Sequence, residues 1–207
     1  MTVRVDHLVF ATPDLNRGIE RIEDLLGVRA TPGGRHPGRG THNALLALGT
    51  DVYLEIIAID PEQPDPPSRR AFELDGLMGA RLVTWAAKST DLDGLRTRAE
   101  ASGIRLGRVQ EGNRRRSDGV TLSWHYTDPS TVVADGLVPF FIDWGTSPHP
   151  AITAPQGARL VELHARHPEP ASVLNQLEIL GVEMSVTRGP RALVAIIDGP
   201  RGRIELS

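Results

Sequence analysis

The chain has 207 residues, of which 40% are hydrophobic and 24% are charged, and its formal net charge is −3. A chain of this composition can bury a core, so we expect one soluble domain or two tightly fused ones, without disorder and without a basic face for nucleic acid or anionic membranes. No apolar run approaches the roughly 20 residues of a membrane span, the N-terminus lacks the features of a secretory signal, and no cysteine is present. We therefore expect a cytoplasmic protein in which only His, Asp or Glu side chains are available to bind a metal.

The first part of the chain predicts a strand, a helix and then further strands. Residues 4–11 are rich in β-branched and aromatic residues, and residues 14–27 carry apolar residues at helical spacing and end on a glycine. Residues 31–41 have the glycine and proline content of a loop. Residues 43–49 and 52–59 then predict a hairpin, which completes a βαβββ unit.

The same order of elements recurs twice along the chain, and internal repetition of this kind indicates a repeated structural unit. We therefore predict the α+β fold class, built from repeated βαβββ modules. The expected divisions are a first module at 1–60, a proline-rich linker at 61–80, a second module at 81–150, and a third module at 157–207 that packs on this pair. Within the second module, residues 113–119 predict a hairpin tip, and we expect its three arginines to be solvated and without a functional role.

Two segments of the first module resemble a known group of proteins. The sequence DHLVFATPDL in the first strand, with YLEII in the last strand of the module, resembles the vicinal oxygen chelate superfamily. More narrowly, GGRHPGRGTHNALLALGTDVYLEIIAID and PFFIDW resemble the glyoxalase-like domain family. The resemblance implies paired modules whose curved mixed sheets form a cup, with helices on the outside and a divalent metal at the base of the cup.

In the superfamily pattern, the metal ligands lie on the first and the fourth strand of each module. His7 and Glu55 match the two positions of the first module. The residues support the same reading, because a carboxylate at the centre of an apolar strand is costly to bury unless it is paired or binds a metal. We therefore predict His7 and Glu55 as metal ligands.

The second module departs from this pattern. Its corresponding positions are Thr84 or Trp85 and Phe141 or Asp143. The third module offers a replacement, because Glu162 aligns with His7 and Glu205 aligns with Glu55, and we add Glu205 to the candidate ligands. The expected cofactor is a divalent ion such as Zn, Mn, Ni or Fe.

The glycine-rich segment after the first helix holds further candidates. Its glycines let donors around Arg35, His36 and Arg39 converge on an anionic group, although a flexible connection is the alternative reading. We predict His36 as a general acid or base at the mouth of the cup, and Glu55 as a second catalytic residue. Arg35 and Asn43 are predicted to bind substrate, with Asn43 orienting His36.

All three tryptophans fall in the second module. Trp85, Trp124 and Trp144 each suit a core position, but as a set they suit the lining of an apolar cup. We predict that these three residues and Phe141 contact the substrate.

Two functions are consistent with these features. The first is an enzyme that uses a divalent metal to chelate neighbouring oxygens of a small substrate, of the lyase, isomerase or dioxygenase type. The second is a metal-free protein that binds or sequesters a small molecule in a cup lined by tryptophans. In both cases we expect a homodimer, a small-molecule partner, and no nucleic acid or membrane partner.

Overall fold

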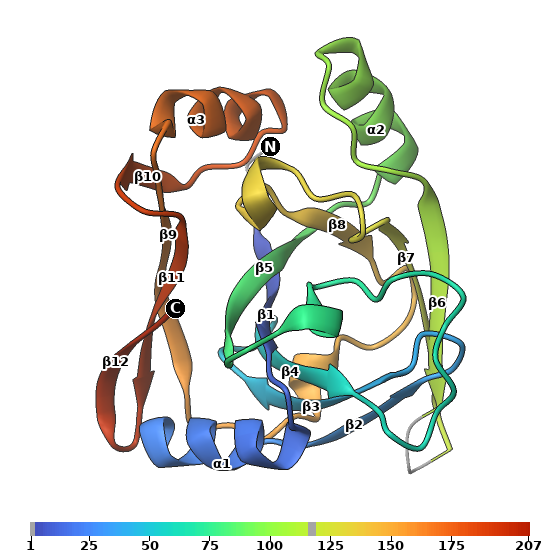
Figure 1. The fold of residues 1–207 in the computed structure, drawn as a ribbon, viewed down its shortest axis with the longest axis vertical. Helices are drawn as coiled ribbons and strands as arrows, with labels where there is room; N and C mark the ends of the chain where they lie inside the picture. Colours follow the sequence, from blue (N-terminus) through green and yellow to red (C-terminus); the bar gives the residue numbers. More distant parts are fainter. Residues whose placement is uncertain (1–2, 116–118) are drawn as a thin grey trace.

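The structure, a computed structural model, describes residues 3–115 and 119–207. A strongly curved sheet of eight strands forms most of the molecule, and a separate sheet of four strands packs beside it (Figure 1). The predicted α+β architecture, with a curved mixed sheet and helices on the outside, is confirmed. None of the helices in the described ranges is long and apolar enough to cross a membrane.

The first unit of the chain supplies one half of the large sheet. Its elements are β1 (Val5–Ala11), α1 (Leu15–Leu26), β2 (Thr31–His36), β3 (Thr41–Ala47) and β4 (Tyr53–Ile59). Helix α1 begins where the Asp14 side chain accepts a hydrogen bond from the backbone nitrogen of Arg17, and it ends at Gly27, whose left-handed φ of 78° disfavours other residues. The segment 31–36, which we predicted to be a loop, is an edge strand, where a proline is tolerated because one side of the strand needs no partner.

The second unit supplies the other half. Its elements are β5 (Arg81–Lys88), α2 (Leu92–Ala101), β6 (Val109–Arg115), β7 (Thr121–Thr127) and β8 (Phe140–Asp143), with short 3₁₀ turns at Leu74–Gly76, Ala134–Gly136 and Pro150–Ile152. The strand order is β2-β3-β4-β1-β5-β8-β7-β6, so β1 and β5 join the two halves as an antiparallel pair. The edge strands β2 and β6 approach each other, which nearly closes the sheet into a cup. Part of the predicted hairpin tip, residues 116–118, lies outside the described residues.

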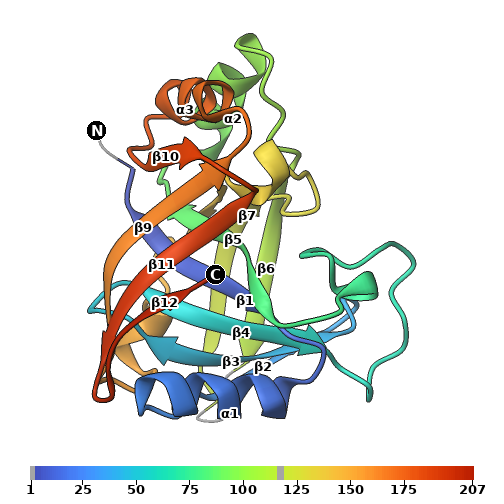
Figure 2. The ribbon, with the colours of Figure 1, turned by 60° about the vertical axis from the view of Figure 1, so that its left-hand side comes forward.

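The last part of the chain forms the four-stranded sheet. Its elements are β9 (Arg159–His167), α3 (Pro170–Ile179), β10 (Ser185–Arg188), β11 (Ala192–Gly199) and β12 (Gly202–Leu206). Its strand order is β10-β9-β11-β12, so its first strand lies inside the sheet, whereas β1 lies at one end of the first unit's strands. The sheet lies against α1 and β5 (Figure 2).

The two faces of the large sheet have different surroundings because side chains alternate along each strand. On the convex face, Leu8 and Phe10 of β1 pack with Ile22 and Leu26 of α1, and this core continues into the four-stranded sheet. The concave face carries His7 and Val9 instead, the latter packed with other apolar residues. The concave face is therefore where polar side chains face a common space.

Candidate functional site

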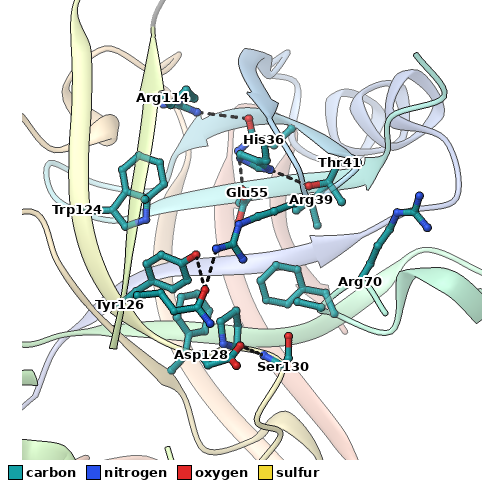
Figure 3. A pocket seen from close by; sticks show the side chains of 18 of the residues that line it. His36, Arg39, Thr41, Glu55, Arg70, Arg114, Trp124, Tyr126, Asp128 and Ser130 are labelled. Atoms are coloured by element: carbon teal, nitrogen blue, oxygen red, sulfur yellow. Dashed lines mark hydrogen bonds between the residues drawn. The ribbon is translucent and has the colours of Figure 1, made fainter. Parts of the chain in front are cut away.

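A cavity of about 580 Å³ occupies the concave face of the large sheet. Strands from both halves of the sheet line it, and the linker between the halves covers part of its opening with residues 66–72 (Figure 3). Arg70 anchors this linker: its guanidinium pairs with Asp65 and Asp75, and its Nε donates a 3.2 Å hydrogen bond to the carbonyl oxygen of Gly40. Residues 66–72 therefore cover part of the cavity and are hydrogen-bonded to the loop beside His36.

Asn43 connects two candidate residues inside the cavity. Its Nδ2 donates a 2.6 Å hydrogen bond to Oε1 of Glu55 and lies 3.3 Å from Nε2 of His36. The other ring nitrogen of His36, Nδ1, lies 2.9 Å from Oγ1 of Thr41. Burial lowers the pKa of His36, although the charge of Glu55 opposes the shift and Arg114 contributes to it. A neutral His36 that donates to Thr41 and accepts from Asn43 satisfies all these contacts.

His7 lies at the base of the cavity beside a buried carboxylate. Its Nδ1 is 2.7 Å from Oδ1 of Asp6, its Nε2 is 3.8 Å from Oε2 of Glu55, and its ring stacks on Tyr53 at 4.6 Å between centroids. His149 contributes a 3.1 Å contact from its Nε2 to Oδ2 of Asp6. Burial raises the pKa of Asp6, but hydrogen bonds and attraction from His149 and His7 outweigh it and lower the value to about 2. Burial and the nearby carboxylates raise the pKa of Tyr53.

Two arginines bring positive charge to the cavity. Arg114 of β6 is only 8% exposed, and its Nη1 lies 3.4 Å from Oδ1 of Asn43. The guanidinium of Arg39 donates a 2.8 Å hydrogen bond to Gln110 and lies 5.3 Å from the centroid of the Tyr126 ring (Figure 3). The arginines at the predicted hairpin tip were expected to be solvated, and for Arg114 this was wrong because the closing of the cup brings β6 against β2 and β3.

The structure brings six of the predicted site residues to this cavity. They are His7, His36, Asn43, Glu55, Trp124 and Trp144. The two tryptophans lie 5.1 Å apart between ring centroids, at a tilt of 46°. The prediction of an aromatic wall thus has a geometric counterpart in two tryptophans rather than three.

Four predicted site residues lie elsewhere. Trp85 and Phe141 point to the convex face, where they are buried in the main core and Trp85 Nε1 donates to the carbonyl oxygen of Leu137. Arg35 points out of the cup and pairs with Asp60 and Glu62. Glu205 lies in the four-stranded sheet, where it is 55% exposed and pairs with Arg166.

The residues of the second half do not fit the four-ligand metal centre that the superfamily pattern implies. His7 pairs in register with Tyr53, two residues before Glu55. The equivalent pair in the second half is Ala86 and Phe140, two residues before Ile142. Ala86 and Ile142, which belong to one apolar cluster, therefore occupy the positions that correspond to His7 and Glu55. In our sequence alignment, Trp85, Phe141 and Asp143 are displaced by one residue from these positions, which moves the side chain to the other face of the strand, and Thr84 is displaced by two.

No group of three His, Asp or Glu side chains with metal-binding geometry occurs among the described residues. His7 and Glu55 are two donors of such a group, and at the corresponding positions the second half of the sheet has Ala86 and Ile142, which cannot bind a metal. We therefore derive no chemical step through a metal.

Sequence reasoning assigned no role in the site to Asp6, His149 or Arg114. Asp6 directly precedes His7. The pairing of β1 with β5 is irregular between Val5 and His7, and at this irregularity the Asp6 side chain lies beside the His7 ring. An aspartate next to the candidate histidine was the available signal. For His149 and Arg114 the sequence gives no comparable signal, because each reaches the site from a distant segment.

Comparisons with known proteins agree with this fold. The family model of the glyoxalase-like domain matches residues 5–181. A hypothetical protein from Staphylococcus aureus has a similar structure, with a TM-score of 0.64 at 12% identity over 98% of this chain and 84% of that chain. Methylmalonyl-CoA epimerase from Mycobacterium tuberculosis gives 24% identity and a TM-score of 0.45, over 68% of this chain and 87% of that chain. A methylmalonyl-CoA epimerase solved with methylmalonyl-CoA and NH4+ gives 19% identity and a TM-score of 0.48, over 72% of this chain and 100% of that chain.

The likeness to the Staphylococcus aureus protein, at 12% identity, concerns the fold and leaves the reaction of this chain open. Comparison with curated proteins found no match. The chemistry must therefore be argued from the cavity itself.

Proposed function

The chain belongs to the glyoxalase-like domain family, and we propose that it is a small-molecule enzyme in which Glu55 transfers a proton to and from a substrate held in the cavity. The observation that carries the proposal is the state of the two Glu55 oxygens. Oε1 is fixed by Asn43 at 2.6 Å, and Oε2 makes no hydrogen bond within the described part of the chain. A carboxylate held by one oxygen and free at the other is suited to general base catalysis.

His36 supports this role by positioning rather than by proton transfer. Both of its ring nitrogens are engaged, one by Asn43 and one by Thr41. Since Asn43 has two amide hydrogens, one serves Glu55 and the other serves His36. We therefore propose Glu55 as the catalytic residue, and His36 and Asn43 as the groups that hold it in place.

The substrate that suits this cavity carries an anionic or strongly polar group. The Arg39 guanidinium has neutral partners, Gln110 and the face of Tyr126, and it forms no ion pair with a carboxylate among the described residues. Arg114 adds a second, buried positive charge beside Asn43. Charges of this kind stabilise the negative charge that develops when a base removes a proton next to a carbonyl group.

A metal-assisted form of this function has two candidate ligands in its favour, His7 and Glu55. The apolar Ala86 and Ile142 at the corresponding positions weigh against the full centre. We therefore assign the proton transfer to Glu55 itself, and the experiment below includes the comparison that separates the two forms.

The test is hydrogen exchange from solvent. Purified protein in D2O is mixed with a panel of dicarbonyls, hydroxy acids and catechols, and proton NMR records the loss of substrate C–H signals, with and without a chelator. We expect exchange for at least one carbonyl compound and an unchanged rate after chelation. Exchange that stops on chelation and returns with a divalent ion would replace proton transfer by Glu55 alone with the metal-assisted form. The absence of exchange across the whole panel would contradict the enzyme proposal.

The alternative function is a protein that binds a small molecule without converting it. The specific observation in its favour is the pair of Trp124 and Trp144 on the cavity wall. For this function, tryptophan fluorescence changes with a ligand that shows no exchange in the NMR experiment. The two measurements on one ligand therefore separate binding from catalysis.

We also propose a homodimer, in keeping with the sequence-based expectation. Its support is the four-stranded sheet, whose strand β9 exposes the apolar Val161 and whose edges β10 and β12 have one neighbour each. A monomeric mass in light scattering at micromolar concentration contradicts the dimer.

A further inference from the structure

Asp6 is a completely buried carboxylate that receives three side-chain contacts. Trp144 Nε1 donates to its Oδ2 at 3.1 Å, Nε2 of His149 lies 3.1 Å from the same oxygen, and Nδ1 of His7 lies 2.7 Å from Oδ1. His7 is the next residue in the chain, whereas Trp144 and His149 lie 138 and 143 positions away and join the end of the second half of the chain to β1. An ionised carboxylate accepts hydrogen bonds only, so each partner must donate.

The protons of this cluster follow from its hydrogen bonds. Trp144 has only a donor. The Nδ1 of His149 accepts a 3.3 Å hydrogen bond from the backbone nitrogen of Ala151, so His149 carries its proton on Nε2 and donates it to Asp6. Since the ionised Asp6 can only accept, His7 must carry its proton on Nδ1 in order to donate it to Oδ1 of Asp6. The remaining nitrogen of His7, Nε2, is left as an acceptor.

This acceptor faces the cavity together with the free oxygen of Glu55. Nε2 of His7 and Oε2 of Glu55 are 3.8 Å apart, which is too far for a hydrogen bond between them. The stacked ring of Tyr53 holds the His7 ring in this orientation. Two acceptors at this spacing leave a place for one donor group between them.

We propose that Asp6 is a positioning residue that fixes the proton of His7 on Nδ1, so that His7 Nε2 and Glu55 Oε2 together receive a hydroxyl or amino group of the ligand. The inference rests on the proposed function in that it assigns a ligand group to the same cavity. Its first test, however, reads the proton of His7 and requires no activity.

The first experiment is nitrogen-15 NMR of the histidine rings at neutral pH, with the His7 signals assigned by their loss in His7→Gln. In the wild-type protein we expect a protonated Nδ1 and an unprotonated Nε2. A proton on Nε2, or on both nitrogens, overturns the assignment. This measurement on the wild type stands even if no Asp6 variant folds.

Asp6→Asn gives a second, opposite expectation. Its single acceptor oxygen has to serve the two fixed donors, Trp144 and His149, so its amide group faces His7. Nδ1 of His7 then has to accept, and the proton moves to Nε2. The shift of His7 from one tautomer to the other is a result that loss of packing alone does not produce, and an unchanged tautomer in a folded variant contradicts the positioning role. Trp144→Phe is the matched control, because it removes one donor but leaves the carboxylate, and it should keep the wild-type tautomer.

The ligand group is tested with two probes, lactate and its methyl ether, 2-methoxypropionate. Lactate offers a hydroxyl donor and the ether does not, while both carry the same carboxylate. We expect lactate at millimolar concentration to shift the His7 Nε2 resonance several-fold more than the ether does. Equal shifts with both probes, or no shift with either, overturn the donor-group assignment. Hydrogen exchange that persists with carbonyl compounds would then leave the role of Glu55 intact.

Discussion

Nδ2 of Asn43 on β3 donates a 2.6 Å hydrogen bond to Oε1 of Glu55 on the neighbouring strand β4. Both residues are nearly inaccessible to solvent. The contact is a charge-assisted hydrogen bond, a class stronger than the neutral kind. It holds the carboxylate to which we assign the chemistry.

Removing this contact should cost stability as well as function. In Asn43→Ala, Glu55 loses a donor and His36 loses the partner of Nε2, so we expect the free energy of unfolding to fall by about 2 kcal/mol. Urea denaturation measures the change. Asn16→Ala on the exposed side of α1 is the matched control and should change stability by less than about 0.5 kcal/mol. Equal effects of the two substitutions would show that the Asn43 contact contributes nothing.

Gly33 should tolerate no side chain, because a Cβ there would lie 2.3 Å from Oδ1 of Asn43 and 2.7 Å from Nη1 of Arg114. Gly33→Ala must push these groups apart, and we expect a loss of about 1 to 3 kcal/mol together with weaker ligand binding. Gly79→Ala, where nothing lies within 4 Å, is the control and should behave like the wild type. Thermal unfolding of both variants checks the difference, and a Gly33→Ala variant as stable as the control would contradict the close packing of β2 against β6.

Ligand binding should be reported by one part of the tryptophan set. Trp124 lines the cavity next to Trp144, whereas Trp85 is 2% exposed on the opposite face of the sheet. We expect the fluorescence change on ligand addition to survive in Trp85→Phe and to fall by at least half in Trp124→Phe. The reverse pattern would place the ligand outside the cavity.

Stability should fall in acid through Asp6. Burial alone would raise the pKa of Asp6, but the hydrogen bonds from His149 and His7 outweigh this effect. The net result is a pKa that falls from 3.8 to about 2 in the folded protein. Because the folded value lies below the unfolded one, the ionised carboxylate stabilises the fold above about pH 4, and this contribution, about 2 kcal/mol, is lost as the pH falls towards 2. Urea denaturation at pH values between about 4 and 2 should show that the free energy of unfolding falls more steeply for the wild type than for Asp6→Asn. Parallel curves would mean that the cluster around Asp6 does not hold the carboxylate ionised.

The sequence predicted the parts of the site that depend on local strand pattern. His7, Asn43 and Glu55 lie on strands of one unit, whose alternation puts all three on the concave face. The same alternation puts Trp85 and Phe141 in the core on the opposite face, and our prediction that they contact substrate was wrong because it rested on the grouping of the aromatic residues in one module and not on the face of the strand. Their neighbours Ala86 and Ile142 are the residues that face the cavity side.

The long-range contacts between side chains of the site could not be predicted from the sequence. Trp144 and His149 reach Asp6 across 138 and 143 positions of the chain, and Arg114 reaches Asn43 across 71. These contacts arise from the curvature of the sheet and from the path of the segment after β8, and neither follows from the hydrophobic pattern. The fold was predictable from repetition, whereas the arrangement of charges within the cup was not.

The measurement that tests the central claim most directly is the rate of solvent hydrogen exchange in Glu55→Gln, with whichever carbonyl compound the wild type exchanges. Glutamine keeps the size of the side chain and removes the base. Glu205→Gln, an exposed carboxylate outside the cavity, is the matched control. We predict a loss of at least about a hundredfold in Glu55→Gln, in line with the usual contribution of a general base, and a wild-type rate in Glu205→Gln. A Glu55→Gln variant that is folded and exchanges at the wild-type rate would contradict the assignment of the proton transfer to Glu55.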